Sequence, residues 1–174
     1  MKSVLLVIDV QKFFINRFTK DIPQKIAEFI NKNHFDCILF TKFVNDKNSN
    51  WYKAGWKRMM NTKDTELVPE LQKYSRKENT FTKTSFSIFR IKEIRQILEE
   101  KSIEKLFICG LDTHACIYAT TLEAYEQGYN VKVIQDLCAA SHGKKYHTEA
   151  LDFLAKNLGK EILIFSNSNY FNKV

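Results

Sequence analysis

The chain has no long hydrophobic segment. None of its apolar runs approaches the roughly 18 residues that a membrane-spanning helix requires. The N-terminus passes almost at once into a short strand-like run and lacks the apolar core and cleavage site of a signal peptide. The four cysteines, at positions 37, 109, 116 and 138, contain no C-x-x-C pair, which is typical of reduced thiols. These absences predict a cytoplasmic protein with no membrane partner.

No linker, repeat or low-complexity tract divides the 174 residues, so we expect a single domain over residues 1–174. The formal charge of +7 has no recognisable nucleic-acid module beside it, and basic neighbours come at most in pairs, such as Lys57-Arg58. A solvated basic surface that attracts anions explains this charge better than a nucleic-acid partner does.

Short apolar runs alternate with helical periodicity along the whole chain. We expect strands near residues 3–9, 35–41, 80–83, 105–109, 130–134 and 161–165. Helices are expected near 23–33, 91–98, 116–127 and 145–157. This alternation predicts a three-layer α/β/α fold with a mostly parallel, roughly six-stranded, Rossmann-like sheet.

Three chemically active side chains fall at the carboxyl ends of these strands. Asp9 ends a buried run, Lys83 ends the third strand, and Cys116 stands where the fourth strand passes into a helix. Since strand carboxyl ends line the crevice of open α/β sheets, a base, a cation and a nucleophile can meet there. The helix dipole and Lys83 are expected to lower the pKa of the thiol. Taken singly, each residue could also be an ordinary group at the end of a strand.

Four segments in this order resemble the isochorismatase-like cysteine hydrolase family over nearly the whole chain. They are residues 8–14 (IDVQKFF), 83–87 (KTSFS), 110–116 (GLDTHAC) and 128–136 (GYNVKVIQD). The resemblance implies that Asp9 is the base, that Lys83 stabilises charge and that Cys116 attacks the substrate. It also implies an oxyanion hole from the backbone N–H groups of Asp112 and Cys116, and a cis peptide bond between Leu111 and Asp112. No cofactor is implied.

Two residues depart from the family pattern. His114 stands where amide-hydrolysing relatives often have an acid, and it is either a solvent-facing residue or a pH-sensitive neighbour of the thiolate. Asp112 stands where a small residue is common, and its side chain could point toward or away from the pocket. The substrate is therefore left open.

The connection over residues 43–79 is the one irregular region. It is either a pocket wall, with Trp56 as an apolar surface and Arg58 for a carboxylate, or a surface that packs on the body or on another subunit. The predicted pocket residues are Gln11, Phe14, Trp56, Arg58, Phe86 and His114. The aromatic and methionine side chains of residues 51–60 favour a homodimer or homotetramer.

This connection contains no histidine. The nicotinamidase branch of the family binds a divalent metal there through an Asp-x-His pair and a further histidine. The four histidines here are His34, His114, His142 and His147, and no two have the i,i+4 spacing of ligands on one helix. We therefore expect no catalytic metal, which disfavours nicotinamidase activity.

These observations predict a metal-independent cysteine hydrolase that cleaves an amide-type C–N bond of a small molecule through a thioester. One alternative is an isochorismatase-type vinyl-ether hydrolase, and a nicotinamidase is less favoured. A different class is a non-catalytic protein of the same fold that binds a small ligand.

Overall fold

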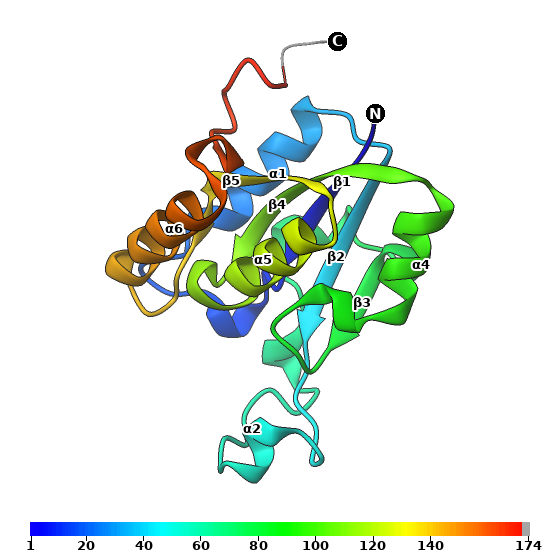
Figure 1. Ribbon diagram of the computed structural model, residues 1–174. Coiled ribbons are helices and arrows are strands. Elements are labelled where there is room, and N and C mark those ends of the chain that lie inside the picture. Colours follow the sequence, from blue (N-terminus) through cyan, green and yellow to red (C-terminus); the bar gives the residue numbers. More distant parts are fainter. Residues whose placement is uncertain (172–174) are drawn as a thin grey trace.

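The computed structural model describes residues 1–171 and contains a six-stranded sheet whose strands are all parallel. The strand order is β3-β2-β1-β4-β5-β6 (Figure 1). The bounds are β1 Lys2–Ile8, β2 Cys37–Phe43, β3 Thr80–Lys83, β4 Ile103–Leu111, β5 Asn130–Ala139 and β6 Leu163–Ile164. The predicted fold class is confirmed.

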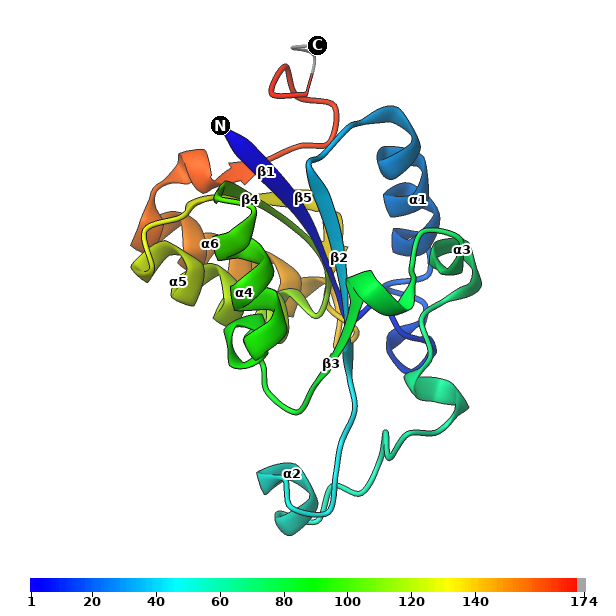
Figure 2. The ribbon, with the colours of Figure 1, turned by 90° about the vertical axis from the view of Figure 1, so that its right-hand side faces the viewer.

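Helices cover both faces of this sheet, as Figure 2 shows. Helices α1 (Ile22–Lys32) and α3 (Pro69–Gln72) lie on one face. The other face carries α4 (Lys92–Glu100), α5 (Tyr118–Glu126) and α6 (Lys144–Leu158). In α1 the buried residues Ile22, Ile26, Phe29 and Ile30 recur at the spacing of one helical face, which fixes that face against the sheet. Within residues 1–171, no helix combines the length and hydrophobicity needed to cross a membrane.

The predicted strands are all present, and their bounds differ most near the C-terminus. β5 continues five residues beyond the expected end at 134 because Leu137, Cys138 and Ala139 remain buried beside β4. β6 has only two residues, since residues 160–162 form a 3-10 turn after Gly159. β2 ends at Phe43, two residues later than expected.

The centre of the sheet positions the functional groups. β1 is buried on both faces, as parallel strands with helices on each side must be. Strand order reverses between β1 and β4, and the crevice at such a reversal is the usual ligand site. β4 approaches β1 so closely at Gly110 that a Cβ there would overlap the carbonyl of Ile8. This glycine therefore allows the segments after Ile8 and Leu111 to leave the sheet side by side.

Residues 44–62 form an arm that projects from the carboxyl edge of the sheet and carries the short helix α2 (Asn50–Lys53) (Figures 1 and 2). Asn45 closes the base of the arm. Its backbone N–H donates to the carbonyl of Met59 at 2.8 Å, and its buried side chain donates to the carbonyls of Trp56 and Arg58 at 2.9 and 3.2 Å. The two ends of the arm are thereby joined.

Candidate active site

Asp9 is the first residue after β1 and is fully buried. Its φ of 51° lies in the left-handed region, which aspartate tolerates better than most residues do, and the chain turns sharply there. Thr41, the neighbour on β2, donates its hydroxyl to Asp9 Oδ1 at 2.7 Å, and the N–H of Asp9 donates to the carbonyl of Thr41 at 3.1 Å. Thr41 thus fixes one carboxylate oxygen and leaves the other for a different partner.

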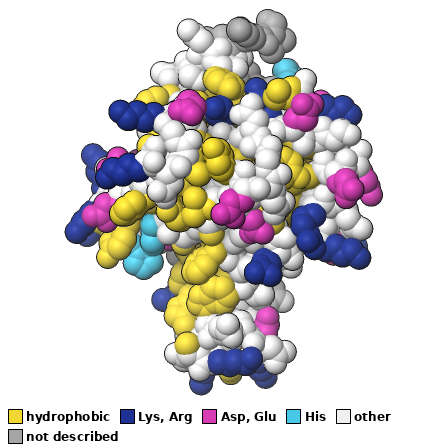
Figure 3. All heavy atoms as spheres, viewed as in Figure 1, with side chains coloured by type: hydrophobic (Ala, Val, Ile, Leu, Met, Phe, Trp, Pro, Cys, Tyr) yellow, Lys and Arg dark blue, Asp and Glu magenta, His cyan; other side chains and the backbone are white. Residues whose placement is uncertain are grey.

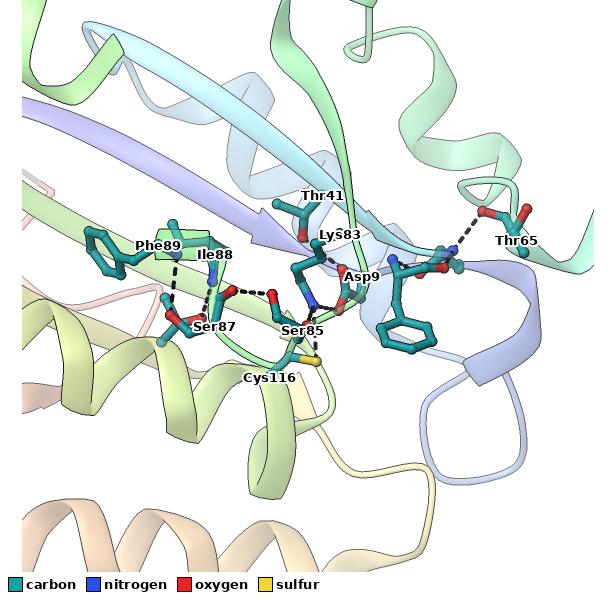
Figure 4. Close-up of polar contacts among 12 residues, drawn as sticks. Asp9, Thr41, Thr65, Lys83, Ser85, Ser87, Ile88, Phe89 and Cys116 are labelled. Atoms are coloured by element: carbon teal, nitrogen blue, oxygen red, sulfur yellow. Dashed lines mark hydrogen bonds and ion pairs between the residues drawn. The ribbon is translucent and has the colours of Figure 1, made fainter. Parts of the chain in front are cut away.

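That partner is Lys83, the last residue of β3 (Figure 4). Its Nζ donates to Asp9 Oδ2 at 2.6 Å, to the carbonyl of Ser85 at 2.8 Å and to Cys116 Sγ at 3.2 Å. Burial disfavours the ammonium charge, but Asp9 and Cys116 together outweigh this and raise the pKa of Lys83 above its usual value. Lys83 is therefore a cation at neutral pH and bridges the carboxylate and the sulfur.

Cys116 lies in a π-helical turn, Thr113–Ile117, and not in the first turn of an α-helix as predicted. The N–H of Ile117 reaches back to the carbonyl of Asp112 at 3.2 Å, an i→i+5 bond that widens the turn, and the regular helix α5 begins only at Tyr118. Such π-turns occur frequently at functional sites. Here the turn places the sulfur against the Asp9–Lys83 pair.

The predicted lowering of the Cys116 pKa is wrong. Burial is the largest effect and raises the pKa of the thiol well above its usual value, since the side chain is only 6% exposed. The charge of Asp9 raises the pKa further, and Lys83 lowers it by less. The resting thiol is therefore protonated at neutral pH and needs a base at the moment of attack.

The predicted cis peptide bond between Leu111 and Asp112 is confirmed. The Asp112 carboxylate is buried and accepts hydrogen bonds from the backbone N–H and the hydroxyl of Ser141, at 2.7 and 2.6 Å. Burial raises the pKa of this carboxyl group in spite of these two bonds. The Asp112 side chain therefore points toward the loop between β5 and α6, where Ser141 holds it.

Gln11 was predicted to line the pocket, but its amide is used within the protein. It is fully buried, donates to the carbonyls of Phe43 and Thr65 at 2.9 and 2.7 Å, and accepts from the N–H of Phe43 at 2.8 Å. Both amide protons therefore have partners. Gln11 joins the end of β2 to the segment at Thr65 and positions the site without facing substrate.

The aromatic side chains of the arm pack against residues of the chain's own body beside Lys83. The ring contacts join Phe43 to Trp51 and Trp56, Trp51 to Phe86, and Trp56 to Phe13, with centroids 5.2 to 6.1 Å apart. Lys83 Nζ lies 5.7 Å from the centre of the Phe43 ring. We call Phe13, Phe43, Trp51, Trp56 and Phe86 the aromatic wall; hydrophobic side chains gather on this arm in Figure 3.

The other predicted pocket residues of this region lie around the wall. Arg58 is exposed and stacks over Phe13 with its guanidinium carbon 4.5 Å from the ring centre, and Phe14 is half-buried against Phe13. Phe86 is 49% exposed, so one face of the wall is open to a ligand. Met59, which we expected in a subunit interface, is only 1% exposed and belongs to the interior of the chain.

His114 is half-buried, and neither expected interpretation describes it fully. Its ring packs on those of His142 and Tyr146, with centroids 5.1 and 5.3 Å apart, and burial lowers its pKa.

Sequence reasoning missed Thr41 and Ser141, which orient Asp9 and Asp112. Thr41 ended a predicted strand beside the one before Asp9, a placement that could have indicated it, whereas nothing in the sequence indicated Ser141.

Comparison with known proteins agrees with this fold. The family model described as Isochorismatase domain matches residues 3–163. The uncharacterized isochorismatase family protein YddQ of Bacillus subtilis is 28% identical over 150 residues, which is 81% of this chain and 79% of that protein. An isochorismatase-like hydrolase from Alkaliphilus metalliredigens has a TM-score of 0.82 at 18% identity, covering 99% of this chain and 98% of its own. N-carbamoylsarcosine amidase from Thermoplasma acidophilum has a TM-score of 0.77 at 18% identity, covering 97% and 98%.

Proposed function

Because the chain belongs to the isochorismatase domain family, we propose that it is a metal-independent cysteine hydrolase that cleaves an amide-type C–N bond in a small molecule. The observation that carries this proposal is the buried contact of Lys83 with both Asp9 and Cys116, at 2.6 and 3.2 Å. A protein that only binds a ligand has no need of a buried cation between a carboxylate and a thiol.

The chemistry follows from the charges. Asp9 accepts the proton of Cys116 as Sγ attacks the substrate carbonyl, and Lys83 stabilises the negative charge that passes from the carboxylate to the sulfur. The backbone N–H groups of Asp112 and Cys116 bind the oxyanion. The C–N bond then breaks, and the leaving nitrogen takes the proton held by Asp9. This leaves an acyl thioester on Cys116.

Water completes the cycle. Asp9, again ionised, accepts a proton from water as its oxygen attacks the thioester carbonyl. The C–S bond breaks, the acid product leaves and the thiol regains its proton. Lys83 remains charged throughout, because its pKa is raised by the two groups it contacts.

Amide hydrolysis is favoured over vinyl-ether cleavage because a protonated thiol beside its own base suits acyl transfer. The fold likeness to N-carbamoylsarcosine amidase supports the same choice. The aromatic wall, which is exposed at Phe86, favours a substrate with a flat or apolar group next to the scissile bond. Four unpaired cysteines fit a reducing compartment such as the cytoplasm.

The test is a screen of small amides and isochorismate-like ethers with the wild type and three variants: Cys116→Ala, Asp9→Asn and Lys83→Ala. On any amide that is turned over, we expect Cys116→Ala to be inactive and the other two to be slower by about 10²–10⁴-fold. Acid-quenched protein should carry the acyl group on the peptide containing Cys116.

The matched control is Cys37→Ala, which removes a partly exposed cysteine outside the site and should leave activity unchanged. Turnover of an amide by Cys116→Ala would refute the proposal. Saturable binding of every tested amide without turnover would instead support a binding protein, and turnover of ethers alone would support the vinyl-ether alternative.

A further inference from the structure

Beside the proposed oxyanion peptide lies a second cluster of chemically active side chains that the hydrolytic mechanism does not use. It consists of Asp112 and His114, at the turn after β4, and His142, in the loop between β5 and α6. One potential ligand atom of each residue lies within 4.8 Å of the corresponding atoms of the others.

We propose that Asp112, His114 and His142 form a binding site for one divalent transition-metal ion of the zinc type. Two imidazole nitrogens and one carboxylate oxygen are a donor set that suits zinc, cobalt or nickel and not calcium or magnesium. Three protein ligands leave a coordination position for water or for another small donor. The site is distinct from the Asp9–Lys83–Cys116 triad and does not depend on the proposed hydrolysis.

The first argument is that the ligand atoms are nearly in place. The Nδ1 atom of His142 lies 3.9 Å from Asp112 Oδ2. Zinc bonds of about 2.0–2.1 Å in a tetrahedron place neighbouring ligand atoms about 3.3 Å apart. For this pair a contraction of about 0.6 Å is therefore needed. The His142 side chain is 66% exposed, so it can move by that amount without disturbing the core.

The second argument is an unsatisfied atom. Nδ1 of His114 is buried and has no hydrogen-bond partner within the described part of the chain. Buried polar atoms are nearly always paired, so such an atom calls for an explanation. The Nδ1 lone pair of a neutral imidazole would be satisfied by a metal ion, and the rings of Tyr146 and His142 already pack against this imidazole.

The third argument is that the carboxylate is oriented in advance. Ser141 donates its N–H to Asp112 Oδ1 and its hydroxyl to Oδ2, which fixes the carboxylate plane. An ionised carboxylate accepts about four hydrogen bonds, so lone pairs remain for a metal. Ligands that are held by outer partners of this kind are a regular feature of metal centres.

The location gives metal binding a consequence. Asp112 supplies its backbone N–H to the proposed oxyanion hole, while its side chain would ligate the ion. A bound metal would therefore connect the turn after β4 to the loop after β5 and restrict the motion of both segments.

The experiment is a zinc titration of the metal-free protein in competition with a chromophoric chelator. We expect one zinc per chain in the wild type, and at least tenfold weaker binding in His114→Ala and in His142→Ala. His142→Ala is the decisive variant, because an exposed loop side chain is not needed for folding. The matched control is His34→Ala, which removes an exposed histidine outside the cluster and should bind zinc as the wild type does.

Zinc can also bind the Cys116 thiolate, so Cys116→Ser separates the two sites. This variant should retain full zinc binding, and its cobalt complex should lack a thiolate-to-metal charge-transfer band. Zinc should also raise the melting temperature of Cys116→Ser but not that of His142→Ala. Absence of saturable binding in the wild type, unchanged binding in His142→Ala, or loss of binding in Cys116→Ser would each overturn the proposal.

Discussion

Replacing Lys83 by Met tests the idea that the site is built on a buried charge pair. The Asp9 and Lys83 side chains are 0% and 1% exposed, with Nζ and Oδ2 only 2.6 Å apart. Methionine keeps most of the length of the lysine stem but removes the charge. The Asp9 carboxylate would then stay buried with two neutral side-chain partners, the Thr41 hydroxyl and the Cys116 thiol.

Removal of one partner of a buried ion pair typically costs about 3–5 kcal/mol, because the remaining charge loses its compensation. This is a large part of the roughly 5–15 kcal/mol by which a domain is stable. For a protein of this size it corresponds to a fall in melting temperature of about 6–20 °C. Urea unfolding at neutral pH, followed by circular dichroism, measures the change in the free energy of unfolding.

Two further variants make the test specific. In the double variant Asp9→Asn with Lys83→Met, the neutral amide oxygen can still accept from Thr41, so we expect it to be more stable than Lys83→Met alone. Lys12→Met removes the lysine of an equally short ion pair with Glu66, whose side chains are 39% and 52% exposed. Solvent screens that pair, and little change is expected. A Lys83→Met variant as stable as Lys12→Met, or a double variant with the summed cost of its two changes, would refute the reasoning.

Three other predictions follow from the same structure. Burial raises the pKa of Cys116 in the folded protein, so above about pH 9 the thiol of the unfolded chain loses its proton first. The free energy of unfolding of the wild type should therefore fall by up to about 1.4 kcal/mol per pH unit more than that of Cys116→Ala. Urea titrations over that pH range check this, and equal slopes would contradict it. The rate at which iodoacetamide alkylates Cys116, measured by mass spectrometry, should fall at least tenfold in Asp9→Asn, while the alkylation rate of Cys37 stays the same. Equal slowing at both cysteines would exclude Asp9 as the base. The half-buried Trp51 and Trp56 on the arm favour self-association, so light scattering should give two or four times 20.5 kDa, and a mass near 20.5 kDa would exclude a stable oligomer.

The sheet could be predicted because its signals are local. The central strands contain short apolar runs. β3, a short run of β-branched and aromatic residues, was found with its observed bounds because Lys83 and the polar residues after it end the run. β6 was overestimated because the apolar run that begins at Ile162 does not show where the 3-10 turn ends and the two-residue strand begins. The meeting of Asp9, Lys83 and Cys116 followed from parallel topology, since all three stand at one edge.

The predictions that were wrong or missing depend on tertiary packing, which the sequence does not show directly. A helix dipole and a lysine both lower a thiol pKa, but the degree of burial that outweighs them at Cys116 is a property of the packed structure. Gln11 lies in the same motif as Asp9, and only the tertiary contacts show that its amide is directed at Phe43 and Thr65. His114 and His142 come from separate loops, so a search for helical ligand spacing could not pair them.

The hydrogen bonds of Asn45 divide the molecule into two parts that can change independently. Because this one side chain joins the ends of the arm at Trp56 and Arg58, residues 46–58 can vary in length and composition without shifting β2 or β3. The arm nevertheless supplies Trp51 and Trp56 to the surface beside Lys83. A chimera that carries the arm of a relative between Asn45 and Met59 would therefore take on the substrate preference of that relative. Its reaction chemistry would be unchanged, because Asp9, Lys83 and Cys116 lie outside the arm.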